Sequence, residues 1–194
     1  MSLHYANTST GTSGYNLTDV GNAERLVNIH GQDIRWEPRW QRWFCWTGKR
    51  WEIDETSEIE RRAKSTIRAI YQEAAAIDIA VSQTCGDANG LKEKAKELRK
   101  HADRSEQKPR IDSLVALAKS EPGVSISHEQ LDADPMLLNT LSGTIDLRTG
   151  ALSQHQRIDF MTKMIAQPFE GINTPAPLWE QFIDEIMCGD REMV

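Results

Sequence analysis

Apolar residues recur at every third or fourth position from Ile59 to Val81, which is the spacing that places side chains on one face of an α-helix. Ser57 and Glu60, at the start of this run, have the spacing of a capping box. The pattern predicts one long helix, whose stripe should form the backbone of the core. The stripe consists of Ile59, Ala63, Thr66, Ile67, Ile70, Tyr71, Ala74, Ile77 and Val81.

Four further segments carry a helical pattern. The first can be capped by Thr18 or Asp19 and closed by Gly31. We interpret His30 as a structural residue of its last turn. The four predicted helices span residues 18–31, 91–102, 109–121 and 178–188. Their predicted apolar faces are Val20, Ala23 and Val27 in the first, Ile111, Leu114, Val115 and Ala118 in the third, and Trp179, Phe182, Ile183, Ile186 and Met187 in the last.

Five of the six tryptophans lie between Asp33 and Ile53, interleaved with arginines and lysines. Two apolar runs at 43–46 and 51–53 flank a turn at 47–50, which predicts a β-hairpin. The rings either pack in the core or stand exposed, where bases of single-stranded nucleic acid could stack on them. We favour core packing, because aromatic rings are buried more often than they are exposed. The tryptophans are Trp36, Trp40, Trp43, Trp46 and Trp51, and the cations are Arg35, Arg39, Arg42, Lys49 and Arg50.

Turn-forming residues dominate the segment from 131 to 163. Asp134-Pro135 predicts the start of a short helix, because the carboxylate can cap free N–H groups and proline suits the first helical position. Residues 144–147 alternate between polar and apolar, and a turn at 148–150 with a glycine predicts a hairpin with 151–153. Residues 124–126 and 158–169 should be extended. The predicted fold class is therefore α+β, helix-rich, with small antiparallel β-hairpins packed on helices.

The run LLNTLSGTIDLRTGAL at 137–152 is the most distinctive part of the sequence. Together with the segments that follow, it resembles the domain that precedes the superfamily 3 helicase in phage and plasmid primases, including the poxvirus primase-helicase. The resemblance covers nearly all of the chain after residue 17, with Ser142 where asparagine is expected. The following segments are His155, Arg157, Asp159, Thr162-Lys163, Pro168-Phe169, Pro177-Leu178-Trp179 and Gly189-Asp190. The motif positions to which we assign a structural role are Asp134, Pro135, Gly143, Asp146, Leu147, Gly150 and Trp179.

The resemblance implies a non-catalytic module of DNA replication that links primase to helicase, aids ring assembly or guides DNA. In such proteins Gly189-Asp190 leads towards the ATPase, so we expect an upstream region truncated before the motor. ATP and Mg²⁺ are then expected in the motor alone, with no cofactor in this chain. The implied partners are the protein's own helicase domain, sister protomers in a ring, and DNA.

Residues 91–110 contain eight lysines and arginines against four acids, a local charge of +4 in a chain whose net charge is -6. This segment is either a ridge that faces DNA or a solvated helix face, and the interleaved Glu93 and Glu97 favour the solvated face. The negative total predicts that any DNA binding by the chain in isolation is weak. The candidate DNA contacts are Arg42, Lys49, Arg50, Lys92, Lys96 and Arg99.

Asp132 and Asp134 stand two positions apart, and paired carboxylates can hold the divalent metal of a polymerase or primase site. His128 is the one further ligand candidate nearby, and helix capping accounts for Asp134, so we expect neither a metal site nor catalytic residues. The sequence contains no phosphate-binding loop and no nucleophile elbow. Two alternatives stay open: a metal-dependent nucleotidyl-transfer or nuclease domain that uses Asp132 and Asp134, and a protein–protein adaptor without DNA contact.

Residues 1–17 are rich in Ser, Thr, Gly and Asn without an apolar period, which predicts a disordered tail before a domain at 18–194. No apolar run approaches the roughly 20 residues of a membrane-spanning helix. A secretory signal is also missing, so we expect the cytoplasm of a bacterial host and no membrane partner. Cys45, Cys85 and Cys188 form no CxxC pair, which indicates free thiols in a reducing compartment.

Overall fold

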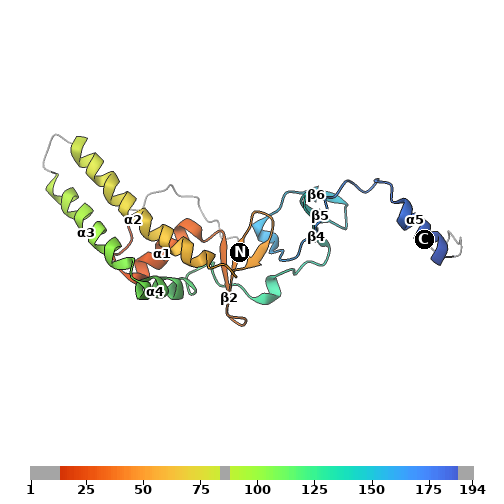
Figure 1. Cartoon of the computed structure of the whole chain (residues 1–194), viewed down its shortest axis with the longest axis horizontal. Helices are drawn as coiled ribbons and strands as arrows, with labels where there is room; N and C mark the ends of the chain where they lie inside the picture. Colours follow the sequence, from red (N-terminus) through yellow and green to blue (C-terminus); the bar gives the residue numbers. More distant parts are fainter. Residues whose placement is uncertain (1–13, 84–87, 188–194) are drawn as a thin grey trace. The chain divides into compact units, whose positions relative to one another are not determined.

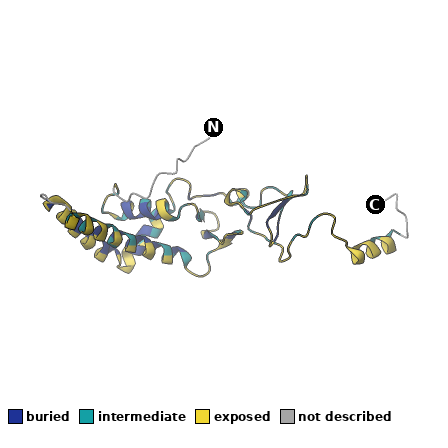
Figure 2. Cartoon of the chain, turned by 90° about the horizontal axis from the view of Figure 1, so that it is seen from above, coloured by how far each residue is buried: buried dark blue, intermediate teal, exposed yellow. Residues whose placement is uncertain are grey.

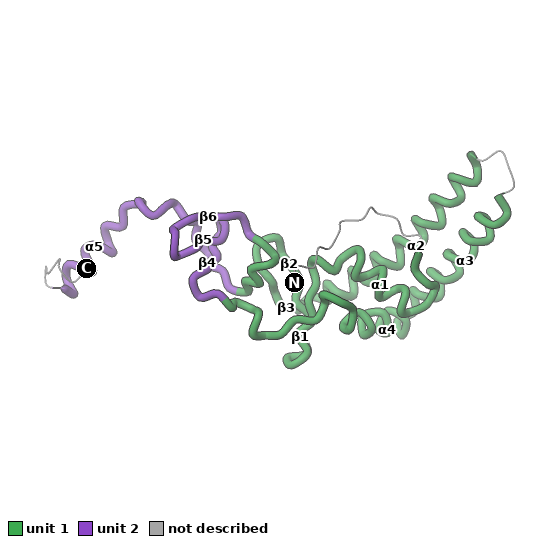
Figure 3. The backbone as a smooth tube through the Cα atoms, turned by 180° about the vertical axis from the view of Figure 1, so that it is seen from behind, with its two compact units in different colours: residues 1–133, 156–162 green, residues 134–155, 163–194 purple. Residues whose placement is uncertain are grey.

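The computed structural model describes residues 14–83 and 88–187 of the chain (Figure 1). These residues belong to two compact units, which Figure 3 distinguishes by colour. The first unit comprises residues 14–133 and 156–162, and the second comprises 134–155 and 163–187. The described residues form five α-helices and two three-stranded antiparallel sheets, so the predicted α+β fold class is confirmed.

Four helices of the first unit match the predicted helices. They are α1 (Asp19–His30), α2 (Glu58–Gln83), α3 (Asn89–Ser105) and α4 (Lys108–Ala118). The long helix α2 packs against α1, α3 and α4, as expected for the backbone of the core. Its buried residues all belong to the predicted stripe: Ile59, Ala63, Thr66, Ile67, Ile70 and Ala74.

The starts of α1 and α2 are capped differently. Thr18 caps α1 as predicted, because its hydroxyl oxygen accepts the N–H of Gly21 at 3.1 Å. The predicted capping box at Ser57 is wrong, since Ser57 has a left-handed backbone with φ of +61°. Asp54 caps α2 instead, and its two carboxylate oxygens accept the N–H groups of Glu58 at 2.8 Å and Ile59 at 2.9 Å. The carboxylate reaches the helix from a turn three residues further upstream than the predicted cap.

The first sheet contains β1 (Ile34–Glu37), β2 (Arg42–Trp46) and β3 (Trp51–Ile53) in the order β1-β2-β3. The pair β2–β3 is the predicted hairpin, with Trp46 opposite Trp51. The sequence did not predict β1, which pairs Trp36 with Trp43. The expected strand at 124–126 is reduced to a parallel bridge between Ser125 and Trp36, in which the Trp36 N–H donates to the Val124 carbonyl at 2.8 Å.

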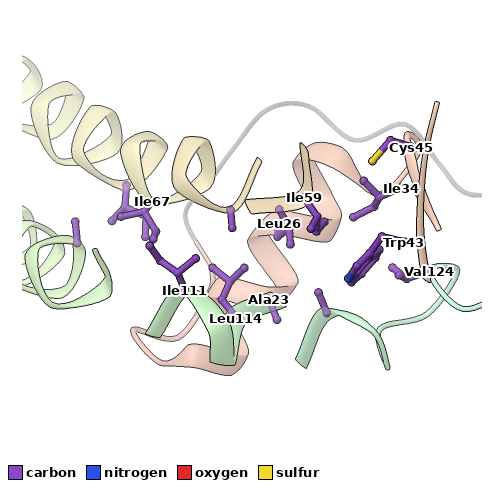
Figure 4. Packing of buried hydrophobic residues seen from close by; sticks show 14 of the residues in the cluster. Ala23, Leu26, Ile34, Trp43, Cys45, Ile59, Ile67, Ile111, Leu114 and Val124 are labelled. Carbon is purple, nitrogen blue, oxygen red and sulfur yellow. The ribbon is translucent and has the colours of Figure 1, made fainter. Parts of the chain in front are cut away.

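The core of the first unit lies between the helices and one face of this sheet (Figure 4). Leu26 is fully buried in it, whereas Val20, which was predicted to face inward, is 51% exposed. The helix α1 packs against both α2 and α4, so its buried face is rotated from the predicted one. Cys45 also lies in this core, and burial raises the pKa of its thiol to about 11. Cys85 and Cys188 lie outside the described residues.

The second unit contains β4 (Leu137–Asn139), β5 (Thr144–Asp146), β6 (Ala151–Ser153) and α5 (Pro177–Ile186). The β5–β6 pair is the predicted hairpin, with Ile145 opposite Leu152. Gly150 has a φ of +71°, the left-handed conformation expected of a turn glycine. The turn has four residues, because Leu147 belongs to it and not to the strand.

The helix predicted to begin at Asp134-Pro135 is wrong, since β4 occupies this segment. The Asp134 carboxylate accepts the Met136 N–H at 3.0 Å, and its carbonyl accepts the Leu137 N–H at 3.2 Å. These bonds close a single turn. The apolar residues that follow then pair with β5, with Leu138 opposite Ile145. The capping chemistry was predicted correctly, but pairing with the next strand, β5, overrode the helix.

Several segment boundaries also differ from the prediction. Short 3₁₀ turns occupy His128–Gln130 and Arg157–Asp159, and the second lies at the start of the segment predicted to be extended. Leu17, assigned to the tail, packs against the core of the first unit. Residues 1–13, 84–87 and 188–194 lie outside the described part, with most of the predicted tail and the break before α3. Within the described residues, every helix is too short or too polar to cross a bilayer.

Candidate DNA-binding surface

The predicted basic residues of α3 are exposed, and acids lie beside several of them. The Lys96 ammonium is 3.3 Å from a Glu93 carboxylate oxygen, one turn away on the same helix. Arg99 forms an ion pair with Asp78 of α2, so an acid from the neighbouring helix faces it. The next helix shows the same pattern, since Arg110 donates to Asp19 at 2.7 Å. The polar face of α3 therefore has the mixed charge of a solvated helix face.

Arg42, Lys49 and Arg50 lie at the two ends of β2. Arg42 begins the strand, and Lys49 and Arg50 follow it in the turn to β3, where Gly48 has a φ of +94°. The Arg50 guanidinium donates to Glu52 at 2.7 Å. The extended backbone rises about 3.3 Å per residue, so the two groups of cations are separated by roughly the length of β2.

The six predicted DNA contacts do not form one surface. In the first unit, α2 and α3 run side by side away from the sheet, and the start of α3 lies at the end of this pair farthest from it (Figure 1). Lys92 and Lys96 are in the first half of α3, whereas Arg42, Lys49 and Arg50 belong to the sheet. The cations of α3 are thus separate from those at the two ends of β2.

Most rings of the tryptophan segment pack against the protein. Trp51 is fully buried and Trp43 is 8% exposed. The Trp51 indole N–H donates to the Arg157 carbonyl at 2.9 Å, and the Arg35 guanidinium lies 4.9 Å from the Trp51 ring centroid. Lys119 covers the Trp36 ring at 3.8 Å, so cations interleave with rings in this structure through internal cation–π contacts. The core-packing interpretation holds for these rings.

Trp40 is the exception, with 48% of its surface exposed. It lies in the turn at residues 38–41 between β1 and β2, and Arg39 and Arg42, which are close to it in sequence, are exposed as well. The sequence did not predict this arrangement. Because it did not predict β1, it could not assign Trp40 to the turn between β1 and β2. Pro38 lies between the alternating run at 34–37 and the apolar run at 43–46, and it was the signal that could have revealed a turn there.

Asp132 and Asp134 each have partners that account for them. In the first unit, Asp132 has a left-handed backbone with φ of +50°, and its carboxylate accepts the Thr162 N–H at 2.7 Å as well as the Thr162 hydroxyl. In the second unit, the Arg148 guanidinium forms a two-point hydrogen bond with Asp134 at 2.8 and 3.1 Å. Arg148, helped by the Met136 N–H, holds the pKa of the Asp134 carboxyl below its usual range.

The third candidate metal ligand, His128, contacts Glu37 and Trp40. Its Nδ1 atom is 3.6 Å from a Glu37 carboxylate oxygen, and its ring packs against Trp40. Among the described residues, no cluster of three or more His, Cys, Asp or Glu side chains could hold a metal ion.

The distinctive sequence run at 137–152 is explained by turns and close approaches within the second unit. A Cβ atom on Gly143 would collide with the Ser153 carbonyl oxygen of the facing strand. Asp146 accepts the Arg148 N–H at 2.8 Å, which closes the hairpin turn. Ser142, at the position where asparagine was expected, accepts the Phe169 N–H at 3.2 Å, and Asn139 bonds to His155 at 2.9 Å. These residues therefore shape the hairpin and the segment that follows it.

Most of the apolar face of α5 is exposed, and Ile183 is half-buried (Figure 2). Trp179 and Phe182 contact each other, with ring centroids 5.6 Å apart. The opposite side of the helix is acidic, with Glu180, Asp184 and Glu185. The exposed apolar residues of this helix are Leu178 (84%), Trp179 (61%), Phe182 (48%) and Ile186 (57%).

Comparison with known proteins supplies the identity that the geometry alone does not. No curated protein matches the chain. A family model described as D5 N terminal like matches residues 23–188, which include all of α2–α4, both sheets and α5. Domains of this family are found in phage and viral primase-helicase proteins. The chain belongs to the D5 N-terminal-like family.

Proposed function

We propose that this chain is the non-catalytic module of a phage or plasmid DNA primase-helicase of the poxvirus type, acting between the primase and a superfamily 3 helicase motor. Its membership of the D5 N-terminal-like family carries the proposal, because this domain is found in phage and viral primase-helicase proteins. In this role the module links primase to motor, aids assembly of protomers into a ring and guides single-stranded DNA.

Guidance of DNA is the part of this role that the first sheet supports. Exposed cations stand at both ends of β2, with Arg39 and Arg42 at one end and Lys49 at the other. A flexible single strand could contact both ends of β2. Proteins that bind single strands place cations along the phosphate backbone and aromatic rings against the bases. The cations of α3 support it less, since acids face Lys96 and Arg99.

Assembly is supported by α5. An exposed apolar stripe with aromatic residues is the usual chemistry of a protein contact, and it favours docking on the helicase domain or on a sister protomer. The adaptor alternative rests on the same observation, without the DNA contact. The nucleotidyl-transfer or nuclease alternative has less support, because Thr162 and Arg148 already occupy the carboxylates of Asp132 and Asp134.

Fluorescence anisotropy with a labelled single-stranded oligonucleotide tests the DNA-guiding role. We expect a dissociation constant of roughly 10⁻⁴ to 10⁻⁶ M at physiological salt for the isolated chain, and a steep loss of affinity as salt rises. Replacement of Arg42, Lys49 and Arg50 by glutamine should weaken binding and flatten the salt slope. The matched triple replacement of Lys92, Lys96 and Arg99 separates α3 from the sheet.

The outcome decides between the module and the adaptor. If both triple variants bind like the wild type, the cations named here do not guide DNA. If the wild type itself shows no binding at about 1 mM protein, roughly tenfold above the weak limit of non-specific binding, the adaptor alternative replaces the DNA-guiding role.

A further inference from the structure

We propose that the turn between β1 and β2 is a stacking platform for a base of single-stranded DNA. Trp40 is the platform, and Arg39 and Arg42 contact the phosphates on either side of the stacked nucleotide. This inference rests on the DNA-guiding role proposed above and assigns that role to particular side chains. It adds Trp40 and Arg39 to Arg42, which was already a predicted DNA contact, and joins them into one ligand site that the family match does not assign.

The exposed ring of Trp40 is supported from beneath by two other rings. Its centroid lies 6.2 Å from that of Phe44, which is 3% exposed, and 5.5 Å from that of His128. The interplanar angles are 44° and 48°, so neither ring covers Trp40 by parallel stacking. Almost half of the Trp40 surface remains in solvent. A planar base therefore finds a ring that is fixed at its base and open to solvent.

A buried carboxylate holds the turn in this shape. Glu37 is 1% exposed, and its carboxylate accepts the Trp40 N–H at 2.5 Å. The N–H groups of Arg39 and His128 also point to it. Burial by itself raises the pKa of Glu37, but these hydrogen bonds outweigh it, so the pKa of the carboxyl lies below its ordinary value. The carboxylate is thus ionised at neutral pH and fixes the backbone at Arg39 and Trp40.

The Glu37 carboxylate also helps to position the Arg39 guanidinium near the Trp40 ring, through His128. His128 Nδ1 lies 3.6 Å from Glu37, and its Nε2 atom lies 3.4 Å from the Arg39 guanidinium. The next residue in the turn, Gln41, has a left-handed backbone with φ of +55°, which turns the chain into β2 at Arg42. A non-glycine residue in this conformation costs free energy, and such strain persists where the surrounding structure over-determines it. The turn is therefore built in advance of any ligand.

The surroundings of Trp40 favour a nucleic acid over a protein as the ligand. Its exposed neighbours in the turn are Pro38, two arginines and Gln41, with Glu129 as the exposed acid on the adjoining 3₁₀ turn. Cores of protein interfaces are depleted in charge, whereas single-strand binders combine one ring per base with cations for the phosphates. Trp179 provides the contrast within this chain, since it is exposed among Leu178 and Phe182.

Two oligonucleotides, one with all its bases and one without its central bases, test the stacking platform. We would measure anisotropy of the chain with a labelled dT 12-mer and with a 12-mer in which the central nucleotides are abasic, which keeps every phosphate. The wild type should prefer the intact strand by at least about fivefold, the ratio that corresponds to about 1 kcal/mol of stacking. Trp40→Ala should remove this preference, and Trp40→Phe should retain part of it. Ile79→Ala in α2 removes another exposed apolar side chain, 60% exposed, and as the control it should leave both affinities unchanged.

The arginines have a separate readout. The double variant Arg39→Gln, Arg42→Gln should bind both strands more weakly, and the slope of log affinity against log salt should fall by about 1.4, which is two single-strand phosphate contacts. Near-ultraviolet circular dichroism checks that each variant is folded.

The results distinguish this inference from the proposed function. If the chain binds DNA but Trp40→Ala keeps the preference for the intact strand, the platform is refuted and the DNA-guiding role stands. If no variant and no wild type binds either strand, both are refuted. If Trp40→Ala changes self-association in sedimentation and leaves DNA binding as it was, Trp40 is a protein contact and the platform is refuted.

Discussion

Gly150 is a single residue on which the hairpin of the second unit depends. Its φ of +71° is strained for any side chain, and a Cβ atom there would lie 3.3 Å from Ile172. We expect Gly150→Val to lower the free energy of unfolding by at least about 1 kcal/mol, since a β-branched residue resists positive φ. Urea denaturation measures this, with Gly90→Ala in α3 as the control. Gly90 has no atom near the added methyl, so that variant should lose no stability.

The stability of the first unit should depend on pH through the ionisation of Glu37. Its folded pKa is lower than its ordinary value of 4.5, so its contribution to stability is present above about pH 4.5 and is lost as the pH falls through the folded pKa. We expect Glu37→Gln to melt at a lower temperature than wild type at pH 7, and the difference to shrink below pH 4.5. Thermal melts between pH 7 and pH 3 measure it, with the exposed Glu97→Gln as control. A difference that stays constant over this range would show that the carboxylate does not hold the turn as an anion.

Asp132 tests whether the paired carboxylates are structural. Its hydrogen bonds to the N–H and hydroxyl of Thr162 predict that Asp132→Ala destabilises the chain by about 1–3 kcal/mol, with a smaller loss in Asp132→Asn. Millimolar Mg²⁺ or Mn²⁺ should leave the wild-type melting temperature unchanged. A rise with metal in the wild type that disappears in Asp132→Ala would instead support the nucleotidyl-transfer alternative.

At the scale of elements, α2 depends on a cap that its own sequence does not contain. Asp54 accepts N–H groups of Glu58 and Ile59, so Asp54→Ala should cost about 1 kcal/mol of stability, the usual value of a helix N-cap. Ser57→Ala, at the position predicted from the capping-box spacing, is the matched control. Chemical denaturation of the two variants compares them directly. Equal losses, or a larger loss for Ser57→Ala, would mean that the helix begins differently.

Local sequence patterns predicted the positions of helices and turns better than they predicted which strands pair. The helical period of α2 and the glycine in the turn before β6 were sufficient to predict these two features, because each depends only on residues that are neighbours in the sequence. Asp134-Pro135 carried a correct signal for a turn but not for a helix, since the strand that pairs with Leu138 begins six residues later. In the same way, β1 could not be predicted from four residues alone, because its partners are β2 and the bridge at Ser125.

The candidate site shows the same limit. The lysines and arginines of α3 were chosen from local charge, but the acid that faces Arg99 is Asp78, on another helix. The exposure of Trp40 depends on Glu37 and His128, which are far apart in sequence and meet only in the fold. Sequence could therefore name the class of residue that a DNA contact would use, whereas the fold selects which of those residues are available.

At the scale of the whole molecule, a net charge of -6 limits what one protomer can do with DNA. A ring would multiply weak contacts along a single strand and raise the overall affinity without any new kind of contact. The DNA path that we propose lies on the first sheet, and α5 is left for protein contacts. These two assignments make the central claim of a module that guides DNA and joins larger partners.

Photo-crosslinking tests that claim most directly. A single-stranded oligonucleotide that carries 5-bromouracil would be irradiated with the chain, and the crosslinked peptides identified by mass spectrometry. The account predicts crosslinks in the turn at residues 38–41, with Trp40 as the attached residue, and fewer crosslinks in Trp40→Ala. Crosslinks confined to α3 or to residues 134–187 would contradict it. So would the absence of crosslinks at several hundred micromolar protein, which is above the weak limit of roughly 10⁻⁴ M for non-specific binding.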